Sequence, residues 1–228
     1  MKKILIFLLI LIESSSIKAQ ITASYTIGYG QYSMSDMKDQ LLETKSNIIK
    51  MIPDLDLAIT DNFPNYFIHN LSIGYKIQKH ELGLTMNYMN TAGKISYADY
   101  SGYISSETHL KGYRGGLYYQ YSLYNLKINK FHQIEFYGEL SPAVIYTKIN
   151  IKQSISPKNE LLNLPNFNYH TYSFSILPQI GAKINLISKL KFILCMGYET
   201  NLYNKCKELD RKINWSGIRI NTGINMAF

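Results

Sequence analysis

The last stretch of the chain alternates strictly between two kinds of side chain. From Gly217 to Phe228, the even-numbered positions carry Ile, Thr, Met or Phe, whereas the odd-numbered positions carry Gly, Arg, Asn or Ala. Because successive side chains of a β-strand point to opposite faces, this period of two predicts a strand with one apolar and one polar face. A transmembrane barrel strand needs such a pair of faces, since one contacts lipid and the other lines a lumen.

Seven earlier stretches alternate in the same way, and turn residues separate them. With the last stretch, they predict an all-β fold, an eight-stranded antiparallel up-and-down transmembrane β-barrel. Two prolines, Pro142 and Pro178, fall inside predicted strands, where we expect local bulges because proline cannot donate to the ladder. The eight predicted strands are Thr22–Tyr32, Tyr66–Ile77, Leu82–Tyr88, Leu110–Leu123, His132–Tyr146, Tyr172–Asn185, Leu190–Glu199 and Trp215–Phe228.

The predicted connections alternate in length. Four are long, at about 33, 17, 21 and 12 residues, and the three between them are short, at about 3 to 8 residues. Short turns on the side of both termini and long loops opposite are typical of outer-membrane barrels, with the termini in the periplasm and the long loops outside the cell. A soluble eight-stranded barrel would not place large apolar side chains outward on every strand.

One helix is predicted in the first long loop. Ser35 is a candidate N-cap, and an apolar stripe of Met37, Leu41, Ile48 and Ile52 follows before Pro53. The stripe favours a surface helix packed on the barrel rim. A lid or a partner-binding helix is the alternative.

The N-terminus has the pattern of a secretory signal peptide. Two lysines precede nine unbroken apolar residues, Ile4–Ile12, and a cut after Ala19 satisfies the small-residue requirement. Nine residues are too few to span a bilayer as a helix, which takes about 20, so an uncleaved anchor is the weaker alternative. We therefore expect residues 1–19 to be a signal peptide and residues 20–228 to be the barrel domain.

Composition agrees with a membrane barrel. The chain has 20 Tyr, a residue favoured where one end of the ring is apolar and the other is wet, as in the aromatic belts of membrane proteins. Without residues 1–19 there are 24 − 3 = 21 basic and 16 − 1 = 15 acidic side chains, a net charge of +6. These charges form no Lys/Arg run, so we expect no nucleic-acid partner.

The inward faces of the predicted strands carry many charges. Counting from the periplasmic ends places Glu135 level with Lys183, Arg114 level with Glu139, and Glu199 level with Arg219. Eight strands leave a lumen that side chains can fill, so buried charges there must be paired. We expect a network that plugs the barrel, with a gated proton or ion path as the alternative. The charged residues are Lys76, Arg114, Glu135, Glu139, Lys183, Glu199 and Arg219.

The strand pattern, the signal peptide and the terminal Phe228 resemble the small outer-membrane β-barrel families, the OmpA/OmpX-like porin superfamily that includes PorT-like proteins. The resemblance covers the whole mature chain. It implies an integral outer-membrane protein surrounded by membrane lipid and lipopolysaccharide, with Phe228 as part of the signal that the barrel-assembly machinery recognises. It implies a structural, anchoring or surface-interaction role. A small channel or a lipid-modifying enzyme are the alternatives.

The sequence offers no convincing catalytic, cofactor or metal site. Lipid A deacylases of this fold use a His and a Ser two residues apart, and none of the five His has such a Ser; lipid A palmitoyltransferases need an Asp-Ser pair that the chain lacks. An extended strand through Cys195 and Cys206 would separate them by about 36 Å, so we predict free thiols. Asp54, Asp56 and Asp61 are a weak calcium candidate without the Gly and Glu of a calcium loop.

Overall fold

The structure is a computed structural model. It describes residues 19–52, 56–100, 102–127, 133–157, 162–163, 165–187, 189–203, 205–206 and 208–228. The predicted signal peptide, except for Ala19, lies outside these residues. No helix within the described ranges is long and apolar enough to cross a membrane.

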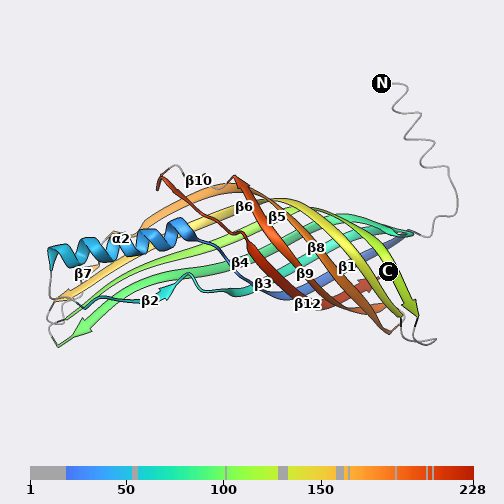
Figure 1. The fold of residues 1–228 in the computed structure, drawn as a ribbon, viewed down its shortest axis with the longest axis horizontal. Coiled ribbons are helices and arrows are strands. Elements are labelled where there is room, and N and C mark those ends of the chain that lie inside the picture. The colour runs from blue at the N-terminus through green and yellow to red at the C-terminus, as the bar shows by residue number, and fades with distance from the viewer. Residues whose placement is uncertain are drawn as a thin grey trace, which may run out of the picture.

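Eight long strands of the described chain close into a ring, each antiparallel to both neighbours, and the ring is completed where the first strand pairs with the last. The predicted barrel is therefore confirmed, and every predicted strand is present. The start of β1 and the C-terminus lie at one end, opposite the helix (Figure 1). In ring order the strands are β1 (Ala19–Gly30), β3 (Tyr66–Ile77), β4 (His80–Asp99), β5 (Gly102–Lys127), β6 (Gln133–Pro157), β8 (Phe167–Ile187), β9 (Leu190–Tyr203) and β12 (Gly217–Ala227).

Shorter elements occupy the end opposite the termini. The helix α2 (Ser35–Met51) follows β1, and β2 (Ala58–Asn62) pairs with the far part of β4. On the other side, β7 (Leu162–Asn163) pairs with β6, while β10 (Lys205–Cys206) and β11 (Arg211–Lys212) form a small hairpin. Helix α2 contacts β4, β11 and β2.

A row of four tyrosines on neighbouring strands marks a change in the character of the barrel wall. Tyr88, Tyr113, Tyr146 and Tyr172 are successive cross-strand partners on β4, β5, β6 and β8, with ring centroids 5.4, 6.4 and 5.0 Å apart. We call this set the tyrosine row. It separates a lower section, which carries the termini, from an upper section, which carries α2 and β2.

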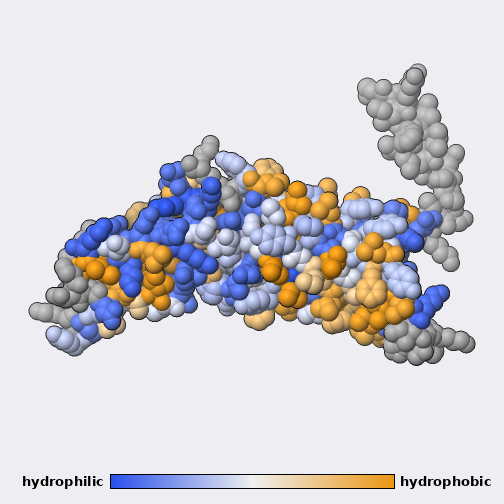
Figure 2. Space-filling view, viewed as in Figure 1, coloured by the Kyte–Doolittle hydropathy of each residue, from blue (hydrophilic) through white to orange (hydrophobic). Residues whose placement is uncertain are grey.

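In the lower section, the apolar side chains point outward. Leu84 and Ile180 are each 62% exposed, whereas Thr85 and Ser141 on the inner face are buried. In the upper section the polarity is reversed, because the inner face carries Leu110 and other residues with no exposed surface. Figure 2 shows most of the hydrophobic surface at the end with the termini and a hydrophilic surface over the end with α2. The upper section is thus built like a water-soluble protein.

A hydrophobic core fills the upper section. Helix α2 contributes Met37 and Leu41, each at most 4% exposed, as the predicted stripe required, although Ile52 is 46% exposed and does not belong to it. The predicted Ser35 cap is wrong: Met34 is the N-cap, in the left-handed conformation with φ 44°, and makes no side-chain capping bond. The core comprises Tyr32, Met34, Met37, Leu41, Leu57, Phe63, Ile68, Met89, Ile95, Leu110, Ile145, Ile149, Ile151, Cys206, Ile213 and Trp215.

Two of the predicted long loops are wrong. The stretch of about 17 residues predicted between the third and fourth strands is strand almost throughout, since β4 ends at Asp99 and β5 begins at Gly102. Likewise β6 continues to Pro157 and β8 begins at Phe167. The outward apolar pattern stops at the tyrosine row, but the strands continue beyond it with the opposite polarity.

The predicted proline bulges are also wrong. The register between β5 and β6 is the same on either side of Pro142, and that between β8 and β9 is the same on either side of Pro178; only ladder pairs are missing there. Near Pro142, the hydroxyl of Ser141 donates to the carbonyl of Leu117 at 3.0 Å. Because Leu117 is the position opposite Pro142, this hydroxyl replaces the missing N–H and the strand needs no bulge.

Candidate functional site: the barrel interior

Glu135 is the centre of a charge cluster near the end of the barrel that carries the termini. Both Lys76 and Lys191 form ion pairs with it, the second at 2.8 Å, and Ser122 donates a further hydrogen bond. Lys183 lies opposite Glu135 in the β6–β8 register, as predicted. Its ammonium, however, binds a different carboxylate, so level positions on neighbouring strands do not by themselves decide the ion pairs.

The partner of Lys183 is Glu81, which the sequence analysis missed. Lys183 Nζ lies 2.9 Å from Glu81 Oε2, and both side chains are 3% exposed. The other carboxylate oxygen accepts hydrogen bonds from Thr22 at 2.7 Å and Tyr118 at 2.8 Å. Glu81 and Thr85 are both odd-numbered residues of β4 and lie on the same face of the strand. The alternation along the strand therefore already indicated that Glu81 faces inward.

Glu139 lies level with Glu81, because Gln120 is the register partner of both. Gln179 donates to Oε1 of Glu139 at 2.6 Å. The predicted level pair of Glu139 with Arg114 is wrong, because Glu139 lies opposite Gln120 in the register and Arg114 lies opposite Ile145. The prediction placed Arg114 too low, since the count from the strand ends omitted the extra residues of β5.

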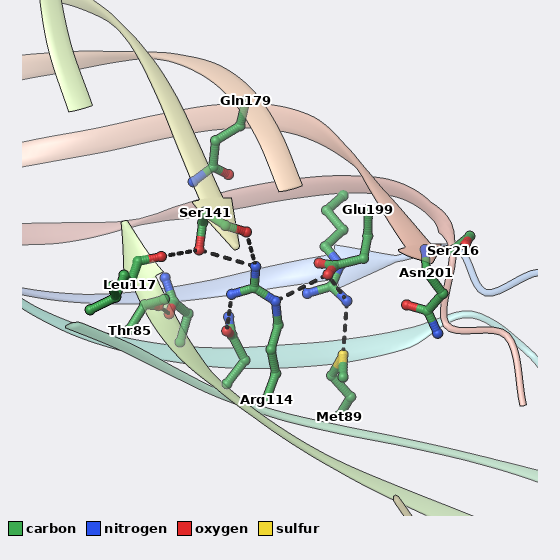
Figure 3. Close-up of polar contacts among 12 residues, drawn as sticks. Thr85, Met89, Arg114, Leu117, Ser141, Gln179, Glu199, Asn201 and Ser216 are labelled. Carbon is green, nitrogen blue, oxygen red and sulfur yellow. Dashed lines mark hydrogen bonds and ion pairs between the residues drawn. The ribbon is translucent and has the colours of Figure 1, made fainter. Parts of the chain in front are cut away.

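Two arginines converge on Glu199 near the top of the lower section (Figure 3). Arg114 Nε lies 3.1 Å from Oε1 of Glu199, and Arg219 Nη2 lies 3.1 Å from Oε2, so the predicted pair of Glu199 and Arg219 forms. Their predicted level is wrong, because Glu199 lies opposite Gly217 and Arg219 lies opposite Gly197 in the register. None of the three side chains is more than 1% exposed. Arg114 also donates to the Asn87 side chain at 3.2 Å and to the Ser141 carbonyl at 2.6 Å. This cluster is the most enclosed part of the network.

Above this cluster, the polar interior meets the hydrophobic core. Arg219 Nη2 lies 3.0 Å from the sulfur of Met89, and the fully buried Trp215 donates from its ring nitrogen to Thr147 at 2.9 Å. A Cβ on Gly112 would lie 3.0 Å from the indole, so a side chain at this position would crowd the ring. Tyr32 packs edge-on against Trp215 at 4.8 Å. The buried indole therefore lies where the polar interior meets the hydrophobic core.

The lumen itself holds little space. A cavity of about 20 Å³, lined by Glu81, Glu139, Lys183 and neighbouring polar residues, is found there, which is room for roughly one water molecule. The carboxylates are engaged by lysine, arginine, amide and hydroxyl groups rather than directed at an open volume. The arrangement fits a packed and mutually neutralised interior.

The candidate reactive groups do not come together. His69 and His170 are exposed on the outside, while Ser72 and Ser173 are buried on the inside, so each pair lies on opposite faces as predicted. Cys195 and Cys206 are both buried and unbridged, which confirms the predicted free thiols. Within the described residues no three His, Cys, Asp or Glu side chains are grouped to hold a metal ion. Asp54 of the calcium candidate lies outside the described residues.

Comparisons with known proteins give structural likenesses only. No protein-family model matches the chain, and no curated protein is similar enough to be matched. Ail, the attachment invasion locus protein of Yersinia pestis, in complex with the heparin analogue sucrose octasulfate, is 14% identical with a TM-score of 0.35, covering 92% of this chain and 97% of Ail. Neisserial surface protein A is 9% identical with a TM-score of 0.40, covering 92% and 97%. At these scores the fold rests on the strand pairing described above.

Proposed function

We propose that this protein is an integral outer-membrane β-barrel with a closed interior, which holds its upper section outside the cell in a structural, anchoring or surface-interaction role. The main support for this proposal is that the outward face of the strands changes from apolar to polar at the tyrosine row. The outward face of β5 is apolar or aromatic from Leu123 to Tyr113, which rises about 25 Å at about 3.3 Å per residue and a tilt of about 40°. That height matches the lipid-facing band of an outer-membrane barrel.

Gel mobility with and without boiling tests the membrane barrel. A closed barrel in which every strand is paired stays folded in detergent until it is heated, so the outer-membrane fraction should give a band that shifts on boiling. A protein that is absent from that fraction and does not shift would contradict the proposal.

The orientation has its own test. With the upper section outside the cell, Ser46→Cys on the exposed side of α2 should react with a membrane-impermeant maleimide in intact cells. Lys79→Cys, in the exposed turn at the other end, should react only after lysis. The native Cys195 and Cys206 are at most 6% exposed and give a low background. The opposite labelling pattern would contradict the orientation.

A gated pore is the rival function. The small cavity among the lumen charges and the buried indole of Trp215 above them support a closed interior over a pore. We therefore expect no stable conductance from the purified protein in planar bilayers, and reproducible single-channel steps would favour the pore.

A further inference from the structure

Two lysines and a histidine lie side by side directly above the tyrosine row. Lys111 on β5 is the register partner of Lys148 on β6, and Lys148 is the partner of His170 on β8. All three are exposed on the outer wall. Neighbouring partners on one face have Cβ atoms about 4.5 to 5.5 Å apart, where like charges repel. Neighbouring lysines in this arrangement lower the stability of the barrel unless a negatively charged group lies against them.

The described residues supply no acidic partner for this row. Neither Lys111 nor Lys148 forms an ion pair with any described carboxylate, and the same is true of Lys152 one step further along β6. The acidic residue nearby, Glu107, is engaged by Lys94 at 2.6 Å and by His109 at 3.2 Å. The hydrogen bond from Lys94 lowers the pKa of Glu107. Glu107 is thus already engaged by other residues.

The row lines a groove that also has an aromatic base. Lys148 Nζ lies 5.8 Å from the ring centroids of both Tyr113 and Tyr146, so the tyrosine row positions this ammonium. The groove measures about 650 Å³ and opens to the outside. Its lining includes Lys111, Tyr146, Lys148, Lys152 and His170.

We propose that this groove binds the phosphorylated headgroup of a lipid in the surrounding outer leaflet, with Lys111 and Lys148 as the phosphate ligands and His170 at the edge. The inference rests on the proposed membrane location. Lys111 is two residues above Tyr113, which places its Cα about 5 Å higher along the barrel axis. Tyrosine belts mark the level of the lipid headgroups, so the ammonium groups lie at phosphate height.

The same geometry favours a lipid over a soluble anion. Below the groove the outward face of β5 is apolar or aromatic, so an acyl chain can follow it while the headgroup stays among the lysines. Two ammonium groups that chelate one phosphate form charge-assisted hydrogen bonds, which are stronger than neutral ones. The best match is a lipid with phosphate close to its acyl chains, such as a bisphosphorylated glycolipid.

The experiment measures how much lipid stays bound to the purified protein. Wild-type protein is reconstituted in phosphatidylcholine vesicles with or without bisphosphorylated lipid A, extracted in mild detergent and weighed by native mass spectrometry. We expect retention of lipid A by the wild type and by Lys111→Arg/Lys148→Arg, and at least about tenfold weaker retention by Lys111→Gln/Lys148→Gln. The control Lys45→Gln/Lys50→Gln removes the same charge from α2 and should retain lipid as the wild type does.

The outcomes separate this inference from the proposed function. Equal retention by the Gln variant and the wild type would overturn the site, and so would binding of the deacylated bisphosphorylated disaccharide as tightly as the intact lipid. Each variant is also checked for the heat-dependent gel shift, so loss of lipid by a protein that still shifts reports on the groove and not on folding. A wild type that inserts and shifts but retains no lipid A overturns the inference and leaves the barrel proposal standing.

Discussion

Arg114 Nε and Glu199 Oε1 lie 3.1 Å apart although their strands, β5 and β9, are not neighbours in the ring. The contact therefore crosses the lumen. Arg219, on β12, binds the other oxygen of the same carboxylate. One buried carboxylate thus joins three strands, two of them on opposite walls, and fixes the interior where water has no access.

Replacing this carboxylate should destabilise the barrel strongly. Glu199→Gln leaves two buried guanidinium groups without a counter-charge, a loss of about 3 to 5 kcal/mol, and should lower the urea midpoint of the gel shift. Arg219→Ala should act in the same direction. Glu43→Gln is the control, because Glu43 is 58% exposed and pairs with Arg211 at the surface, where such pairs are worth about 1 kcal/mol or less.

Equal urea resistance of Glu199→Gln and Glu43→Gln would contradict the role of the buried cluster. A triple replacement of Arg114, Glu199 and Arg219 by Met should recover part of the loss, because it leaves no unpaired charge.

Ser141 and Pro142 should behave as a coupled pair. The Ser141 hydroxyl donates to the Leu117 carbonyl in place of the N–H that Pro142 lacks, so Ser141→Ala leaves that carbonyl unpaired at a cost of about 1 to 3 kcal/mol. Pro142→Ala restores a backbone donor, and the cost of Ser141→Ala should shrink in that background. A double-mutant cycle by urea unfolding measures the coupling. Additive costs would mean that the hydroxyl does not substitute for the missing N–H.

The sequence predicted what depends on local alternation. Parity along each strand placed Arg219 and Lys183 inside and Leu84 outside, because a period of two needs only neighbouring residues. It also contained Glu81, which was missed at the end of a predicted turn. Relations between non-adjacent strands, such as that of Arg114 with Glu199, depend on the tilt and stagger of the whole ring. The alternation of residues within one strand gives no information about the tilt or the stagger of the ring.

The upper section was missed for a different reason. Ile149 and Ile151 are inward apolar residues of β6, whose outward face has already become polar at Lys148. A search for outward apolar residues ends strands at the tyrosine row and assigns the remainder to loops. The exchange of apolar and polar residues between the two faces of these strands indicated that the strands continue beyond the membrane. The hydrophobic residues of α2 pack against the inward apolar residues of this part.

Trp215 should act as the lid of the hydrophobic core. Its truncation to Ala removes a fully buried side chain, a loss of about 3 to 5 kcal/mol, and loosens the core that contains Cys206, which is 1% exposed. Maleimide labelling of Cys206 in folded protein should therefore rise in Trp215→Ala. The same variant with Cys206→Ser separates this signal from that of Cys195. Labelling that stays at the wild-type level would show that the core closes without the indole.

Phe228 offers a test of assembly separate from stability. Its backbone N–H donates to the Ile21 carbonyl at 2.9 Å, but its ring is 64% exposed, so the ring adds little to the folded barrel beyond contact with lipid. If the barrel-assembly machinery recognises this residue, deletion of Phe228 and Phe228→Ala should both reduce folded protein in cells, while Phe228→Tyr should not. Refolding of the purified Ala variant into detergent should match the wild type by gel shift. Normal cellular assembly of the Ala variant would contradict the recognition role, and an equal defect in cells and in detergent would assign the effect to stability.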